Sequence, residues 1–159
     1  MMKCSTVSFK GQVIYCGIDV HKSSWHVSIR HCRHQIENFS MNPDAFELVR
    51  HLQKNYPEAE YRSVYEAGFS GFETHRQLCS QGVLNIVINP VDVPTSGKER
   101  DYKNDSLDSR KLARELENGS LEGIYIPEAE NLELRNLTRR ETQLTGNIVR
   151  TKNRIRSLL

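Results

Sequence analysis

The fold of this chain is decided by one stretch, Val13-Ile14-Tyr15-Cys16-Gly17-Ile18-Asp19-Val20. β-Branched and aromatic residues dominate it and no proline interrupts it, so it predicts a β-strand. One carboxylate, Asp19, lies near its end between two apolar residues. An ionised carboxylate beside a buried strand costs free energy unless a cation compensates it. Asp19 therefore either binds a cation or begins the turn that follows, because Asp is also a common turn residue.

Composition predicts a polar domain that is not secreted. The 159 residues suffice for one domain with a good core and an appended element, and 22 basic and 20 acidic residues nearly cancel. We expect neither secretion nor a membrane span, because residues 1–12 lack an apolar core and no run approaches about 20 apolar residues. Without a C-x-x-C pair, the scattered cysteines predict free thiols in a reducing cytoplasm. They are Cys4, Cys16, Cys32 and Cys79. The His-Cys-Arg-His stretch at 31–34 lacks zinc-site spacing and a second half.

The pattern along residues 13–88 alternates between strands and helices. Residues 25–29 and 35–41 predict two more strands, which short polar turns join to the first as a meander. A helix is predicted from Asn42-Pro43-Asp44 to Pro57. A strand over 61–66, a helix over 72–82 and an apolar strand over 83–88 follow. The order βββαβαβ predicts an α/β domain with a mixed sheet.

Three further segments follow the sheet. Residues 89–101 contain two prolines and mixed charge and predict a mobile surface loop, and residues 104–117 predict a helix that Gly119 ends. An extended link over 124–127 places a domain boundary, so we expect a domain of residues 1–126 and a long helix over 127–159. Apolar residues occupy two heptad columns of this helix, with interruptions at Glu141 and Thr151, which is typical of a coiled coil or bundle. These columns contain Leu134, Ile148 and Ile155, and Leu137, Leu144 and Leu158.

The last third of that helix is basic, with Arg150, Lys152, Arg154 and Arg156 and no acid after Glu141. Such a run is either a solvated helical face or a surface that binds nucleic acid. The chain ends on two leucines without a cap, as expected of a chain cut within a helix.

Four carboxylates lie at the ends of three predicted elements: Asp19, Glu66, Asp105 and Asp108. The last two are three residues apart and share one helix face. The helix dipole stabilises acids in a first turn, so this pair alone has a structural explanation. The full set of four is better explained by metal binding, because Mg²⁺ prefers oxygen ligands. Two such ions about 4 Å apart would clamp the oxygens of an in-line phosphoryl transfer.

Three blocks of sequence carry a resemblance to a known family. They are Gly-Ile-Asp-Val-His-Lys at 17–22, Tyr-Glu-Ala-Gly at 65–68 and Lys-Asn-Asp-Ser-Leu-Asp-Ser-Arg-Lys-Leu-Ala at 103–113. In this order they resemble the DEDD transposases of bacterial insertion sequences, the insertion-sequence 110 family, which includes the pilin-gene inverting recombinase. Ser109 stands where the family often has Ala. The resemblance covers nearly the whole chain but only the N-terminal half of the family's protein.

The resemblance implies a RuvC-like (ribonuclease H-like) mixed sheet with flanking helices, followed by a long coiled-coil-type helix. It implies that Asp19, Glu66, Asp105 and Asp108 are catalytic and hold Mg²⁺ or Mn²⁺. It also implies an RNA-guided DNA recombinase that assembles through the long helix as a homodimer or higher oligomer. The family's C-terminal domain, with a serine thought to be the nucleophile, is absent from this sequence.

Alternative functions remain open at the level of sequence. The chain is a transposase half, a self-sufficient Mg²⁺-dependent junction-resolving nuclease, or a non-catalytic fragment that binds nucleic acid and dimerises. An actin-like ATP-binding domain also begins with such a strand, but no glycine-rich phosphate loop follows Asp19. We expect His21, Lys22 and Lys103 to assist the acids or meet a scissile phosphate without binding metal. Otherwise these three are ordinary turn and loop residues.

Overall fold

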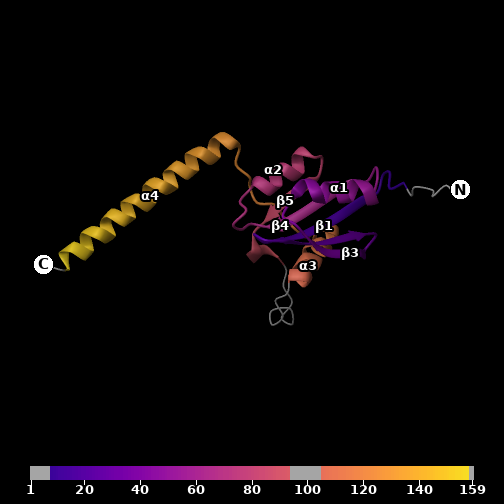
Figure 1. Ribbon diagram of the computed structural model, residues 1–159, viewed down its shortest axis with the longest axis horizontal. Coiled ribbons are helices and arrows are strands. Elements are labelled where there is room, and N and C mark those ends of the chain that lie inside the picture. Colours follow the sequence, from indigo (N-terminus) through magenta and orange to yellow (C-terminus); the bar gives the residue numbers. More distant parts are fainter. Residues whose placement is uncertain (1–7, 94–104, 158–159) are drawn as a thin grey trace. The chain divides into compact units, whose positions relative to one another are not determined.

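A five-stranded mixed sheet forms the centre of the molecule, as the sequence predicted. The computed structural model describes residues 8–93 and 105–157 (Figure 1). The sheet order is β3-β2-β1-β4-β5. Strands β1, β2 and β3 pair antiparallel, whereas β4 and β5 run parallel to β1. The strands are β1 Val13–Val20, β2 Trp25–His31, β3 His34–Met41, β4 Glu60–Glu66 and β5 Leu84–Ile88.

Strand β1 is the central strand of the sheet, between β2 and β4. Ile14, Cys16 and Ile18 are fully buried on one face. Gly17, on the other face, leaves room for a helix. Strand β1 pairs with β2 through Val20 and with β4 through Ile18, so ladder hydrogen bonds hold the backbone up to the position of Asp19.

Helices cover both faces of the sheet (Figure 1). Helices α1 (Ala45–Asn55) and α2 (Glu73–Ser80) lie on one face and α3 (Asp105–Asn118) lies on the other. Helix α1 begins where the sequence predicts, because the Asp44 side chain accepts hydrogen bonds from the backbone N–H groups of Phe46 and Glu47. This mixed sheet, with helices on both faces, is the RuvC-like (ribonuclease H-like) arrangement that was expected.

The connection after β5 contains a short 3-10 helix, η1 (Pro90–Asp92), capped by Asn89. The rest of the predicted mobile loop, residues 94–101, lies outside the described part of the chain. Beyond α3, the N–H of Ile124 donates to the carbonyl oxygen of Val87 at 2.7 Å, so the chain returns to the outer edge of β5.

Helix α4 (Ala129–Arg156) belongs to a separate unit. Contacts divide the chain into Met1–Ile124 and Tyr125–Leu159, close to the expected boundary at residue 126. Within the described residues, none of the helices is long and apolar enough to cross a bilayer. Among the described side chains of α4, six large apolar ones are more than half exposed. They are Leu134, Leu137, Leu144, Ile148, Val149 and Ile155.

Candidate active site at the carboxyl ends of β1 and β4

Asp19 and Glu66 lie side by side at the ends of two parallel strands. The register pairs Ile18 of β1 with Tyr65 of β4, so the next residue of each strand stands at the same level. Both carboxylates belong to the face that α3 covers, because side chains alternate and Gly17 lies against α3. The Asp19 side chain is 21% exposed. We call this pair of carboxylates the acidic corner.

Gly17 sets how closely α3 approaches β1. A Cβ atom at Gly17 would lie 2.1 Å from the carbonyl oxygen of Ser109 and 2.4 Å from the backbone nitrogen of Ala113. Both helix residues are fully buried. The backbone of α3 therefore rests directly on the strand that carries Asp19.

The direction of α3 follows from its contacts near the two ends. Ser109, near the start, lies over Gly17. Glu117, near the end, accepts a hydrogen bond from Nε of Arg30 at 2.8 Å. Arg30 pairs with Tyr15, two residues before Gly17 on β1. Helix α3 thus runs antiparallel to β1, and its first turn extends toward the carboxyl end of that strand.

Asp105 and Asp108 occupy this first turn. They precede Ser109 and Leu112 by four residues each, and those two residues are buried under the helix. Helical spacing puts Asp108, which is half-buried, one turn before the buried Leu112 and so near the side of α3 that faces the sheet. The Asp105 side chain lies outside the described part of the structure. Among the side chains that are described, no three potential ligands form a group, so the four-acid metal site stays a prediction.

The predicted auxiliary residues differ in their placement. Nε2 of His21 lies 3.0 Å from Oδ2 of Asp19, so His21 contacts a predicted ligand directly. The N–H of His21 also donates to the carbonyl oxygen of Ser24, which closes the turn after β1. Lys22 is exposed in this turn, and Lys103 lies outside the described residues.

Gly17 and His26 were not predicted as functional residues. Gly17 stands inside an otherwise β-branched strand, and an interior strand glycine often marks a close backbone approach. His26 of β2 is the direct partner of Asp19. Residues opposite each other on antiparallel strands have Cβ atoms about 4.5–5.5 Å apart. The pairing of Asp19 with His26 follows from the register of β1 and β2, which the sequence alone does not give.

Three groups with shifted pKa values, Cys16, Tyr65 and His75, lie on the face of the sheet opposite the acidic corner. Burial raises the pKa of Cys16 to about 12 and that of Tyr65 to about 12. Burial also lowers the pKa of His75, and the charge of Arg76 acts in the same direction. Nδ1 of His75 accepts a hydrogen bond from the Asn85 side-chain amide at 2.9 Å, which ties α2 to β5. Tyr65 and His75 thus join α2 to the sheet on the face away from the acidic corner.

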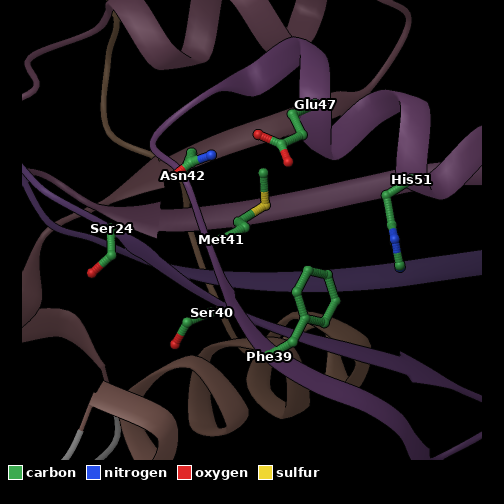
Figure 2. Close-up of a pocket in the computed structure, with 7 residues that line it drawn as sticks. All are labelled: Ser24, Phe39, Ser40, Met41, Asn42, Glu47 and His51. Atoms are coloured by element: carbon green, nitrogen blue, oxygen red, sulfur yellow. The ribbon is translucent and has the colours of Figure 1, made fainter.

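A pocket of about 580 Å³ opens at the edge formed by β3 and α1 (Figure 2). It contains none of the four predicted acids. Its lining residues are Ser24, Phe39, Ser40, Met41, Asn42, Glu47 and His51. Phe39 and His51 are in ring contact there, so the pocket lies mainly on the α1 face of the sheet, opposite the face of the acidic corner.

The order of the mixed sheet and the helices on its two faces give this domain the RuvC-like fold, within the ribonuclease H-like folds. The family model for DEDD transposases of the IS110 type, described as "Transposase", matches residues 16–159. The chain belongs to this transposase family.

Two curated relatives are similar over parts of their length. The protein y4rJ of Sinorhizobium fredii, provisionally assigned as a transposase, is 34% identical over 102 residues, which are 60% of this chain and 26% of that protein. The transposase for insertion sequence element IS1533 of Leptospira borgpetersenii is 26% identical over 151 residues, which are 92% of this chain and 43% of that protein. The chain thus spans less than half the length of either relative.

Among solved structures, RuvC of Thermus thermophilus in complex with a Holliday junction substrate is similar with a TM-score of 0.48 and 11% identity. The match covers 70% of this chain and 99% of that one.

Proposed function

We propose that this chain is the RuvC-like half of an insertion-sequence transposase, which cleaves and exchanges DNA strands by metal-dependent phosphoryl transfer. One observation supports the proposal in this member of a transposase family: Asp19 and Glu66 end two neighbouring parallel strands, and the first turn of α3 extends toward the same end of β1. Asp19 and Glu66 extend from the ends of paired strands and are only partly exposed to solvent. Such carboxylates are suited to bind a metal ion.

In this proposal Asp19, Glu66, Asp105 and Asp108 hold Mg²⁺ or Mn²⁺. Four carboxylates are a donor set of the kind that hard divalent cations prefer. When bound, the metal supplies charge stabilisation for the attacking and leaving oxygens of the phosphoryl transfer. Strands β1 and β4 carry Asp19 and Glu66, and the first turn of α3 carries Asp105 and Asp108. His21 contacts one oxygen of Asp19 and so restricts rotation of that carboxylate.

The remaining assignments follow the same proposal. Residues 1–126 form the catalytic domain that acts on DNA in the cytoplasm, with a guide RNA supplied by the element. Residues 127–159 assemble the protein as a homodimer or larger oligomer. Lys22 and Lys103 meet the scissile phosphate. The basic end of α4 contacts the nucleic-acid backbone through Arg150, Lys152, Arg154 and Arg156.

The test of this function is metal-linked stability. Repulsion among the acids destabilises the metal-free fold, and the unfolded chain offers no comparable site, so Mg²⁺ or Mn²⁺ should raise the melting temperature. Asp19→Asn should remove most of that increase and stabilise the metal-free protein by relieving repulsion. Calorimetry with and without millimolar metal measures both effects. Asp92→Asn is the matched control, because it makes the same change at an exposed acid in η1.

The absence of any metal-dependent increase in the wild-type melting temperature would contradict the assignment. If metal binds and the chain alone cleaves DNA junctions, it is a self-sufficient nuclease. If DNA binding persists unchanged after loss of all four acids, and the chain has no strand-cleavage activity even when the missing C-terminal domain is added in trans, it is a binding and dimerisation module.

A further inference from the structure

A row of polar side chains crosses the sheet beside the acidic corner. Asp19 pairs with His26, and His26 pairs with Ser40 on the edge strand β3. Paired residues point to the same face, so the imidazole and the hydroxyl stand on the face of the acids. Oγ of Ser40 lies 2.9 Å from Nδ1 of His26. His26 is half-buried and Ser40 is exposed.

The contact with Ser40 determines which atom of His26 is presented outward. When the Ser40 hydroxyl donates to Nδ1, the ring proton of the neutral imidazole resides on Nε2. Nε2 of His26 makes no hydrogen bond to any residue within the described ranges, 8–93 and 105–157. In that arrangement His26 presents an Nε2–H donor one strand away from Asp19, on its β2 side.

Such a donor supplies what the acids lack. Clustered carboxylates repel the phosphate groups of a DNA strand and cannot donate a hydrogen bond to them. An N–H beside them can hold a non-bridging phosphate oxygen without competing for the metal. Imidazole is also a poor ligand for Mg²⁺ compared with carboxylate oxygen, which argues against a role for His26 in the metal site.

We propose that His26 is a DNA-contacting residue whose Nε2–H binds a backbone phosphate beside the acidic corner, with Ser40 as its positioning residue. This inference rests on the proposed function, since it places a DNA strand at that corner. Figure 2 shows Ser40 and Ser24 on one side of the pocket and Glu47 on the other, so the pocket carboxylate stands apart from the proposed phosphate contact.

The experiment uses the whole 159-residue chain and a short fluorescein-labelled DNA duplex, with binding followed by anisotropy in Mg²⁺. His26→Ala should weaken binding about tenfold or more, because it removes a hydrogen bond to a charged group. His26→Gln, which keeps an N–H at a similar distance, should recover much of the loss. Ser40→Ala should show an intermediate loss, because the ring is present but not oriented. His34→Ala removes an exposed histidine at the far end of β3 and should bind as the wild type does.

Metal-linked stabilisation is the second measurement and separates a phosphate contact from a metal ligand. His26→Ala should keep the full rise of melting temperature with Mg²⁺. Loss of that rise to the extent seen in Asp19→Asn would make His26 a ligand and overturn the inference. Wild-type affinity in His26→Ala would overturn it too, while leaving the proposed function intact. A wild-type chain with neither metal response nor DNA affinity would refute the proposed function, and this inference with it.

Discussion

Gly17 has no side chain, and the backbone of α3 occupies the space that one would need. The obstructing atoms belong to the main chain of Ser109 and Ala113, so no rotamer change can make room for a methyl group. The helix would have to move as a whole, together with the first turn that carries Asp105 and Asp108. The absence of a Cβ atom at residue 17 therefore determines how closely the first turn of α3 approaches the strand that carries Asp19.

Gly17→Ala is expected to destabilise the domain by about 3 kcal/mol, the upper end of the cost of overpacking a close-packed interior. It should also reduce the rise of melting temperature with Mg²⁺, because α3 is displaced from the acidic corner. Calorimetry measures both quantities. Gly68→Ala is the control, since its Cβ would meet only the carbonyl oxygen of Glu66 at 3.9 Å. Equal stability of Gly17→Ala and Gly68→Ala would show that α3 does not depend on residue 17.

At the scale of elements, α2 is fastened to the sheet through a chain of hydrogen bonds. Ser63 donates to Oδ1 of Asn85 at 2.6 Å, and the Asn85 amide donates to His75 at 2.9 Å. The His75 backbone N–H donates in turn to the hydroxyl of Tyr65. Because Nδ1 of His75 accepts a hydrogen bond, the neutral ring fits this arrangement and burial lowers its pKa.

Stability should therefore depend on pH through His75. Its pKa in the folded state is below the ordinary value of 6.5, so the unfolded chain binds a proton first as the pH falls. The contribution of neutral His75 is complete above about pH 6.5 and declines as the pH drops toward the lowered folded pKa. His75→Asn keeps an acceptor for Asn85 and cannot titrate. Urea unfolding at several pH values should show a steeper acid decline in the wild type than in this variant, and identical slopes would contradict the assignment.

Helix α4 presents two surfaces that nothing within its own described unit covers. One is the exposed apolar stripe, and the other is the basic end. At that end Arg150 donates to Oδ1 of Asn147 at 2.9 Å, while the neighbouring cations are exposed. Exposed cations along one helix end can each displace a counterion from a nucleic-acid backbone.

Replacing all four cations of this end with Gln should flatten the plot of log affinity against log salt by about 3–4 units, if every one touches a phosphate. The substituted residues are Arg150, Lys152, Arg154 and Arg156. A variant in which the three arginines become lysine keeps the charge and should keep the slope. DNA titrations at several salt concentrations give these slopes. An unchanged slope in the Gln variant would mean that the charges only solvate the helix.

At the scale of the whole molecule, the apolar stripe of α4 predicts self-association. The helix of 28 residues is about 40 Å long, enough for several heptads of contact. Leu144→Glu buries a charge at the centre of that contact and should shift the mass in solution from oligomer to monomer. Thr142→Glu, on an exposed position of the same turn, should leave the mass unchanged. Light scattering across protein concentration measures it, and a monomeric wild type would contradict this assembly.

The sequence by itself determined the elements and the candidate acids. The periodicity of β1 and the short turns after it predicted the meander, and the predicted helix over 104–117 is found as α3, Asp105–Asn118. Such features depend on neighbours within a few residues, where hydrophobic period and capping side chains decide the conformation. The four acids were named for the same reason, since each lies in a short recognisable motif.

Only the tertiary structure decided which distant residues meet. The pairing of Asp19 with His26 is a matter of strand register, and the contact of Arg30 with Glu117 joins residues 87 apart. The antiparallel course of α3, which aims its first turn at the acidic corner, depends on that contact and on the close approach at Gly17. Register and packing are set by the free energy of the whole core, so no local pattern contains them.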